Sequence, residues 1–291
     1  MMRKLQNNQM LLGWLLLLPA LAIIGTFIFY PMFQAFSYSF VKWDFFSEKQ
    51  YVGISNYKYL LLEDLVFKKT LFNTFYFTIS NMIGSLVLAL AVALVASKEM
   101  KGIGFLRTMQ FIPVVIPMAI AGIVWKLMFE PSFGAINSIL EGLGIPAQMW
   151  LFDKNLAMPT VILLSIWKDF GLYMIIFVGG LQKIPDELYE AIHMDGANRW
   201  QAFWRLTLPM LKPTTFFVST MLMINSFKVF DQVWVMTQGG PGTATITMVT
   251  YIYQRVLESV GVATSASVVL FVIVLVLMFL QYRVVGRENK S

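Results

Sequence analysis

The sequence predicts an all-α integral membrane protein with six transmembrane helices and both termini in the cytoplasm. Three observations support this class: 58% of the 291 residues are hydrophobic, only 13% are charged, and long apolar stretches recur along the chain. A soluble domain has about 25% charged residues, and one this apolar would expose patches that aggregate. These numbers exclude a soluble single-domain enzyme. The 25 Phe, 11 Tyr and 8 Trp also exclude a disordered chain.

Six apolar stretches are long enough to cross the hydrocarbon core, which takes about 20 helical residues. The predicted spans are 10–30, 71–96, 108–129, 158–181, 214–236 and 263–282. Prolines lie inside the first and third spans, where neighbouring helices can satisfy the carbonyls that they free. The first span resembles a cleaved signal peptide, but its apolar run continues to Tyr30, so we expect it to be retained. We therefore predict one transmembrane domain over residues 1–291.

Basic residues indicate which side of the membrane each connection occupies. More than half of the 22 Lys and Arg residues fall in the two termini and in the second and fourth connections: Arg3, Lys4, Lys98, Lys101, Arg107, Lys183, Arg199, Arg205, Lys212, Arg283, Arg287 and Lys290. Cytoplasmic loops carry such an excess, so we place these segments in the cytoplasm. The same bias accounts for the net charge of +6 without nucleic acid, which we do not expect as a partner.

The outer connections are longer and more aromatic. Within them, 136–143 and 246–260 have amphipathic patterns that predict short surface helices. Gly239 to Gly242 (Gly-Gly-Pro-Gly) is expected to end the fifth span, because Gly and Pro interrupt helices.

The fourth connection, residues 182–213, has the pattern of a folded element. Pro185 suits the start of a helix, and Gly196 suits its end. A second short helix is expected over 199–206, ending at Pro209. Two interpretations remain open at this point: an interfacial structure that stabilises the bundle, or a docking surface for a cytoplasmic partner.

Specific motifs in this connection resemble the EAA loop of ABC importer permeases. The matching residues are Glu190-Ala191-Ile192, Asp195-Gly196-Ala197, Phe203 and Leu208-Pro209. Flanking motifs resemble the carbohydrate-uptake group, of maltose and glycerol-3-phosphate type: Trp43-Asp44, Val52-Gly53, Asn56-Tyr57, Trp167 with Gly171, Leu181 to Pro185, and Thr237 to Pro241. The Gly-Gly-Pro is similar to that of one of the two permease types in such systems. Ile192 departs from the pattern, since the family usually has Ala there.

The resemblance implies a cytoplasmic coupling helix between spans 4 and 5 that sits in a cleft on an ATPase subunit. The implied coupling residues are Glu190, Ala191, Asp195, Gly196, Ala197, Arg199 and Pro209. Implied partners are a second related permease, two ATP-binding subunits and an extracellular or periplasmic solute-binding protein. ATP and Mg would be bound by the partner ATPase, because this chain has no P-loop motif. With no Cys and one His, we expect no metal, cofactor or catalytic residue in this chain.

Polar residues inside two spans are candidates for a substrate pathway: Lys168, Asp169, Tyr173, Asn225, Lys228, Asp231 and Gln232. At 100° per residue, Asn225, Lys228 and Gln232 fall within about 60° on a continuous helix, which predicts one polar stripe. Such groups either line a path for a hydroxyl-rich solute or are neutralised internally, with Lys228 pairing with Asp231 and with Lys168 and Asp169 pairing with other helices. The resemblance favours the path, because sugar contacts in that family come from these spans.

These observations together predict a non-enzymatic, multi-pass permease subunit in a bacterial or archaeal cell membrane. It would import a carbohydrate, an oligosaccharide or polyol derivative, by ATP-driven alternating access. The alternatives are an ion-coupled secondary transporter or channel without an ATPase, and a non-transporting membrane scaffold. A secondary carrier typically has internal repeats around an ion site, and we find no convincing repeat here.

Overall fold

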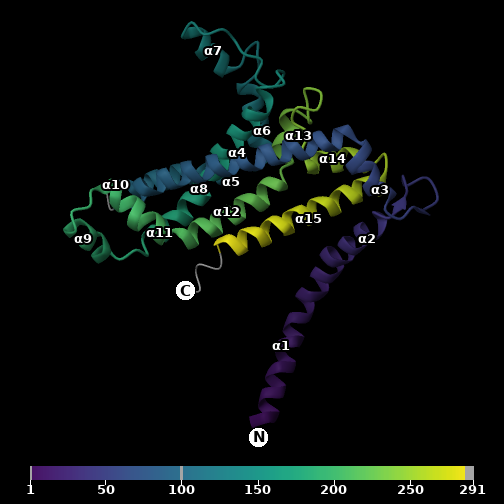
Figure 1. Cartoon of the computed structure of the whole chain (residues 1–291), viewed down its shortest axis with the longest axis horizontal. Helices are drawn as coiled ribbons and strands as arrows, with labels where there is room; N and C mark the ends of the chain where they lie inside the picture. Colours follow the sequence, from purple (N-terminus) through teal and green to yellow (C-terminus); the bar gives the residue numbers. More distant parts are fainter. Residues whose placement is uncertain (1, 99–100, 286–291) are drawn as a thin grey trace. The chain divides into compact units, whose positions relative to one another are not determined.

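The computed structural model describes residues 2–98 and 101–285, without the side chains of 2–9, 11, 284 and 285. Arg287 and Lys290, which we expect in the cytoplasm, lie outside the described residues. The described chain is mostly helical (Figure 1). Its α-helices and strands are α1 (Met2–Ile24), α2 (Tyr30–Tyr38), β1 (Val41–Lys42), β2 (Gln50–Tyr51), α3 (Ser55–Lys58), α4 (Leu65–Ala96), α5 (Ile103–Val115), α6 (Met118–Met128), α7 (Ala135–Gly142), α8 (Ala157–Leu181), α9 (Asp186–Met194), α10 (Arg199–Ala202), α11 (Leu208–Met210), α12 (Lys212–Phe227), α13 (Asp231–Met236), α14 (Met248–Arg255) and α15 (Val260–Val285). The short turns η1 (Gly25–Phe29), η2 (Tyr59–Glu63) and η3 (Phe203–Thr207) are π-helical.

Several of these helices are long and apolar enough to cross a membrane. The continuous ones are Leu12–Tyr38, Leu65–Ala96, Ala157–Leu181 and Val260–Arg283. A fifth candidate is the pair α5 and α6, which is bent by 96°. The all-α membrane class is therefore confirmed. The count of six spans and the cytoplasmic side of both termini stay predictions.

Two predicted spans are divided in the structure. The third breaks at Ile116, whose φ of −69° and ψ of 130° are extended, as is usual for a residue before proline. Pro117 cannot donate a backbone hydrogen bond, so α6 starts anew after it. The fifth is divided into α12 and α13 by the non-helical residues 228–230. The prediction of one continuous helix over 214–236 is therefore wrong.

Capping explains where one of the other spans begins. α4 begins six residues before the predicted start, because the Asp64 side chain accepts a hydrogen bond from the backbone N–H of Phe67 at 2.9 Å. Such an N-cap satisfies an otherwise unpaired donor in the first turn. α8 agrees with its prediction within one residue. The predicted amphipathic segments form α7 and α14, and α13 ends before the Gly-Gly-Pro-Gly sequence, as expected.

The chain divides into two compact units. In the first, residues 2–63 with 252–269, strands β1 and β2 pair antiparallel. The buried Asn56 donates to the carbonyls of Ser39 and Val41 at 2.9 and 3.0 Å, which fixes the hairpin to α3. At the start of α15, Gly261 packs against the Val41 carbonyl so closely that any side chain would overlap with it. A glycine is therefore required at this crossing.

The hairpin of the first unit is closed by Asp44. Its carboxylate accepts hydrogen bonds from the Ser47 hydroxyl at 2.6 Å and from the Ser47 and Phe46 backbone N–H groups at 2.7 and 3.1 Å. The hydroxyl of Ser47, and then its N–H, hold the pKa of Asp44 below its ordinary value of 3.8. Hydrogen bonds to the charged form favour that form, so the turn prefers ionised Asp44.

The second unit, residues 64–251 with 270–285, contains the helices that carry the candidate sites. In it α8 packs against α4 and α5, α4 also packs against α12, and α13 packs against α6. The most buried of the candidate spans is α8, with 61% of its apolar window inside the protein. In Figure 1, α9 and α10 lie beyond the ends of α4 and α8.

Candidate functional site

The fourth connection forms two short helices, as predicted. Pro185 precedes α9, and Asp186 and Glu187 occupy its first turn, where their charges complement the positive helix end. After α9, Gly196 has a φ of +81°. Its N–H bonds the carbonyl of His193 at 3.0 Å, and the Ala197 N–H bonds that of Ile192 at 3.1 Å. These two bonds define a Schellman motif, which needs a left-handed residue at the position of Gly196.

The second helix of the connection begins at a capping box. The Asn198 side chain accepts from the Gln201 N–H, and the Gln201 side chain accepts from the Asn198 N–H, each at 2.9 Å. The helical path then continues through η3 and α11 to Met210. The predicted end at Pro209 is therefore wrong. Pro209 instead lies within this path, as the second residue of α11.

One side of α9 is bonded to and packed against the rest of the second unit. The Tyr189 hydroxyl and the Thr207 hydroxyl are 2.9 Å apart in a hydrogen bond that joins α9 to η3. Tyr189 packs against the apolar core that Ile184 and Leu181 help to form. A hydrogen bond of this kind stabilises a fold by about 0.5–1.5 kcal/mol, and the apolar contact adds to it.

The other side of α9 faces solvent in this chain. Glu190, Ala191, Asp195 and Gly196 are exposed, and Ala197 is half-buried. Arg199 and Pro209 are exposed farther along the connection. The structure thus gathers the predicted coupling residues on α9, its turn and the following helical segment, and leaves nearly all of them accessible. An exposed helix held rigidly at its back has the geometry of a docking element.

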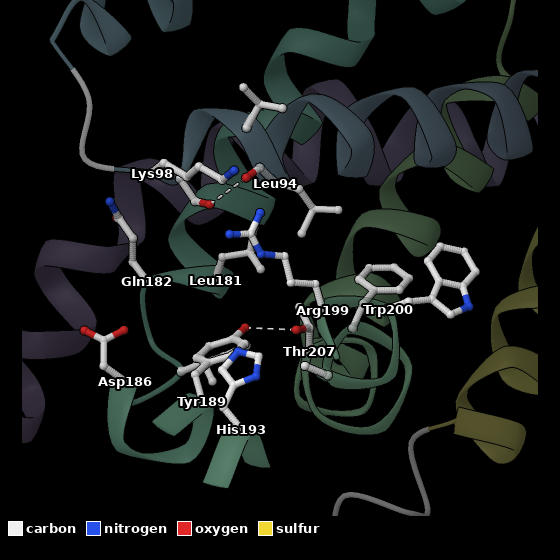
Figure 2. Close-up of a pocket in the computed structure, with 15 residues that line it drawn as sticks. Leu94, Lys98, Leu181, Gln182, Asp186, Tyr189, His193, Arg199, Trp200 and Thr207 are labelled. Carbon is white, nitrogen blue, oxygen red and sulfur yellow. Dashed lines mark hydrogen bonds between the residues drawn. The ribbon is translucent and has the colours of Figure 1, made fainter. Parts of the chain in front are cut away.

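A large cavity lies behind α9, with a volume of about 1200 Å³. Figure 2 shows its walls, which come from the ends of α4 and α8 and from α9, α10 and η3. Its lining includes apolar side chains such as Leu94 and Leu181, and the charged or titratable Lys98, Asp186, His193 and Arg199. The motifs of the sequence gave no indication of this cavity, because its walls come from segments far apart in the chain.

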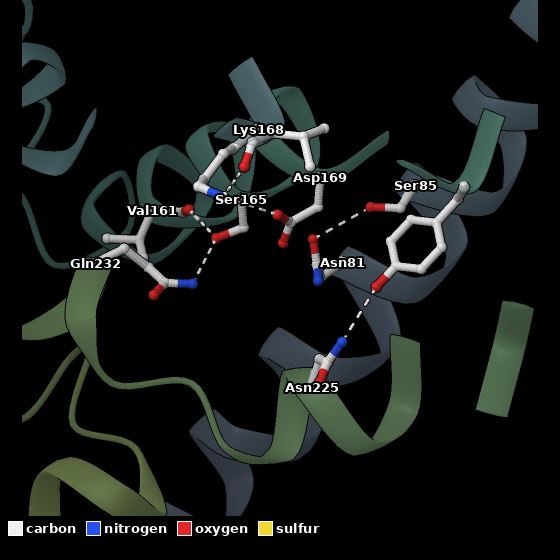
Figure 3. Close-up of polar contacts among 10 residues, drawn as sticks. Asn81, Ser85, Val161, Ser165, Lys168, Asp169, Asn225 and Gln232 are labelled. Atoms are coloured by element: carbon white, nitrogen blue, oxygen red, sulfur yellow. Dashed lines mark hydrogen bonds and ion pairs between the residues drawn. The ribbon is translucent and has the colours of Figure 1, made fainter. Parts of the chain in front are cut away.

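The in-span polar residues form a second cluster, which we call the membrane polar cluster: Asn81 and Ser85 of α4, Ser165, Lys168, Asp169 and Tyr173 of α8, Asn225 and Ser226 of α12, and Gln232 of α13. Figure 3 labels its members except Tyr173 and Ser226. Asn225 Nδ2 lies 3.4 Å from the Tyr173 hydroxyl. Gln232 Nε2 donates to the Ser165 hydroxyl at 3.1 Å. These two bonds link α12 and α13 to α8.

Lys168 is nearly buried within this cluster. Its Nζ lies 3.4 Å from Asp169 Oδ1 and 3.5 Å from the carbonyl of Val114. In a continuous helix that carbonyl would accept from the residue four positions later, but the break at Pro117 removes this partner. The Lys168 ammonium thus lies near a carbonyl that lost its helical partner at the break, and it forms a long ion pair with the carboxylate of Asp169.

The predicted polar stripe is not present as such. α12 ends at Phe227, so the assumption of 100° per residue fails between Asn225 and Gln232. These two residues nevertheless both contact α8, whereas Lys228 and Asp231 are exposed. Among the residues that the structure describes, Lys228 and Asp231 form no ion pair with each other. The interpretation of their mutual neutralisation is therefore wrong.

Sequence reasoning missed the α4 partners of the cluster. The Asn81 side chain donates to the Ser226 hydroxyl at 2.9 Å and accepts from Ser85 at 3.4 Å. Asn81 and Ser85 are four residues apart in an apolar span, which places them on one helix face. That spacing was the available signal, since buried polar groups need partners inside a membrane.

Comparisons with known proteins agree with this architecture. Residues 71–290 match the family model "Binding-protein-dependent transport system inner membrane component". The chain is 36% identical over 287 residues to the sn-glycerol-3-phosphate transport system permease protein UgpA of Agrobacterium fabrum, covering 96% of each. It is 34% identical over 291 residues to the trehalose/maltose transport system permease protein MalF of Thermococcus litoralis, covering 99% of this chain and 98% of the relative.

A solved structure shares the fold. A chain of a bacterial ABC transporter involved in the import of the polysaccharide alginate superposes with a TM-score of 0.86 at 23% identity, covering 98% of this chain and 99% of that one. The matches extend over nearly the full length and do not favour a channel or secondary carrier that acts alone. The chain belongs to the family of inner membrane components of binding-protein-dependent transport systems, the permease subunits of ABC importers.

Proposed function

We propose that this permease subunit imports a carbohydrate, an oligosaccharide or polyol derivative, by ATP-driven alternating access. Relatives at 34–36% identity carry names that specify trehalose and maltose or sn-glycerol-3-phosphate, which supports a polyhydroxylated solute. One structural observation carries the mechanism: α9 presents an exposed face and is fixed at its back through Tyr189. A partner that moves α9 would therefore move the helices attached to it.

The coupling surface comprises Glu190, Ala191, Asp195, Gly196, Ala197, Arg199 and Pro209. Glu190 offers an exposed carboxylate for a basic residue of an ATP-binding subunit, and Gly196 sets the direction in which the chain leaves α9. Closure of two ATP-binding subunits around ATP and Mg would displace α9 as a rigid lever. The ATP chemistry belongs to those subunits, and this chain is not an enzyme.

The substrate pathway runs along the membrane polar cluster and the break between α12 and α13. The break leaves Asn225, Lys228 and Asp231 exposed beside the buried Gln232. An amide, an ammonium and a carboxylate together donate and accept hydrogen bonds, as sugar hydroxyls require. Lys168, Asp169 and Tyr173 form the opposite wall on α8. Free in-span charges usually face a cavity or another subunit, which supports this assignment.

The assembled importer would contain a second, related permease, two ATP-binding subunits and an extracellular or periplasmic solute-binding protein. It would lie in the cell membrane of a bacterium or archaeon, with residues 1–291 acting as one permease domain and 182–213 as its cytoplasmic coupling loop. The name of the matched family supports the binding protein, because transport in that family depends on one. Contact between lipid and the apolar spans follows from their exposed side chains.

Glu190→Lys in the reconstituted importer tests this function. We expect uptake to be abolished and co-purification of the ATP-binding subunits to weaken, while the chain stays inserted in the membrane. Glu187→Lys is the matched control, since it makes the same charge change one turn earlier on α9. Normal uptake by Glu190→Lys, or equal losses in both variants, would contradict the coupling role.

A further inference from the structure

The cavity behind α9 combines unpaired positive charge with apolar walls. Arg199 lines it and makes no hydrogen bond or ion pair with the residues that the structure describes. Its guanidinium extends from α10 toward the wall that α4 and α8 form (Figure 2). A guanidinium has five N–H donors in a planar fork that fits two oxygens of a phosphate or carboxylate. A cation in this position has donors available for an anion.

Other groups around the cavity also favour an anionic ligand. Lys98 and His193 line the cavity, and Asp186 is the one acidic side chain among the described residues of its lining. The His193 Nδ1 atom contacts the Ala197 carbonyl at 2.9 Å, which leaves its other ring nitrogen available. Tyr189 and Thr207 bond each other and so do not compete for Arg199. The described part of the lining therefore carries more basic than acidic side chains.

The rest of the lining is suited to an acyl or glycerol moiety. Leu94, Val95, Leu181, Ile184 and Phe203 supply apolar walls, and the exposed ring of Trp200 stands at the edge. Trp is enriched where hydrocarbon meets headgroups, because its ring is apolar and its N–H is polar. We expect this end of the second unit in the cytoplasm, next to the leaflet surface where anionic lipids gather.

We propose that the cavity behind α9 binds the phosphate of an anionic phospholipid headgroup from the cytoplasmic leaflet, with Arg199 as its main ligand. Lys98 adds a second positive charge, and the apolar walls hold the glycerol and the first carbons of the chains. The volume of about 1200 Å³ exceeds that of a phosphate alone and leaves room for this part of the lipid. The site is separate from the membrane polar cluster, and it shares Arg199 with the coupling surface.

Native mass spectrometry of the purified importer, with phosphatidylglycerol or phosphatidylcholine added, tests the proposal. We expect the wild type to retain phosphatidylglycerol in preference to phosphatidylcholine. Arg199→Gln should weaken phosphatidylglycerol retention about tenfold or more, since a charge-assisted bond of this kind contributes about 1.4 kcal/mol or more. Lys98→Gln should weaken it less.

Arg205→Gln is the matched control, because Arg205 is exposed on η3, carries the same charge and does not line the cavity. Equal retention of the two lipids by the wild type, or equal effects of Arg199→Gln and Arg205→Gln, would overturn the proposal. Displacement of the lipid by millimolar inorganic phosphate or glycerol 3-phosphate would support the phosphate site but overturn the lipid as its source. Uptake is not the readout, so failure here leaves the carbohydrate assignment unaffected.

Discussion

The turn after α9 allows a quantitative test of how the coupling loop is built. Gly196 has a φ of +81°, and its N–H and that of Ala197 close the Schellman motif. No atom lies within 4 Å of where a Cβ would be, so any cost of a side chain comes from backbone strain and not from crowding. An L-residue other than Gly pays about 1–2 kcal/mol in this conformation.

We therefore predict a graded effect of Gly196→Asn, Gly196→Ala and Gly196→Val. Asn tolerates the left-handed region and should cost least, and the β-branched Val should cost most. A cost of about 1–2 kcal/mol raises the opening equilibrium of the turn about five- to thirtyfold. Hydrogen–deuterium exchange of a peptide covering 192–198 should report this increase, and transport should fall in the same order.

Gly179→Ala provides the control for this series. Gly179 lies inside α8, is exposed and has no neighbouring atom within 4 Å of the place that a Cβ would take, so Ala fits there without strain. Ala is favoured over Gly in a helix interior by about 0.8–1 kcal/mol, so exchange in α8 should slow or stay unchanged. Wild-type exchange at 192–198 in Gly196→Ala, or no ranking among the three substitutions, would refute the reasoning.

Three further predictions concern the outer loops and the substrate pathway. The buried side chain of Asn137 forms hydrogen bonds with Pro131 O, Gln148 N and O, and Trp150 Nε1. Asn137→Ala should therefore destabilise the segment 131–150 by about 2–4 kcal/mol and speed its proteolysis. Asn155→Ala, at an exposed position, should do neither, and equal cleavage of the two variants would contradict the role of these hydrogen bonds. The pKa of Asp44 is lower in the folded turn than its ordinary 3.8, so ionised Asp44 stabilises the hairpin above that pH and the effect is lost as pH falls through the lower folded value. Amide exchange over 41–51, corrected for intrinsic rates, should show this loss in the wild type but not in Asp44→Asn; identical pH profiles would refute it. Lys228→Leu should change the KM or maximal rate of uptake without loss of stability, since Lys228 is exposed and has no ion-pair partner among the described residues. Lys154→Leu, in an outer loop, should leave the uptake kinetics unchanged. Unchanged kinetics in Lys228→Leu would make Lys228 structural.

Local chemistry made the coupling loop predictable from the sequence. Pro185, Gly196 and the acidic first turn of α9 act within a few residues of their position, so their effects follow from the chain itself. The same holds for the extent of α8, which is apolar and lacks an internal break. The prediction for Pro209 is wrong because its fixed φ is itself helical, and the backbone keeps helical angles from η3 into α11.

The break between α12 and α13 had no comparable signal. Residues 228–230 are Lys, Val and Phe, without Gly or Pro, and all can be helical. Tertiary contacts decide their conformation: the Thr247 hydroxyl, for example, donates to the Val229 carbonyl at 3.1 Å. The contact between Asn81 and Ser226 likewise joins residues 145 positions apart, and the cavity behind α9 brings residues 94–98 together with residues 181–207. Such features follow from packing and not from local sequence pattern.

We propose that this chain provides a path for transport and that its partner subunits provide the energy. The most direct test compares carbohydrate uptake by proteoliposomes that contain the chain alone with uptake by those that contain the assembled importer, its solute-binding protein and ATP. We expect concentrative uptake only with the complete assembly and hydrolysable ATP. Accumulation of the carbohydrate by the chain alone would contradict it.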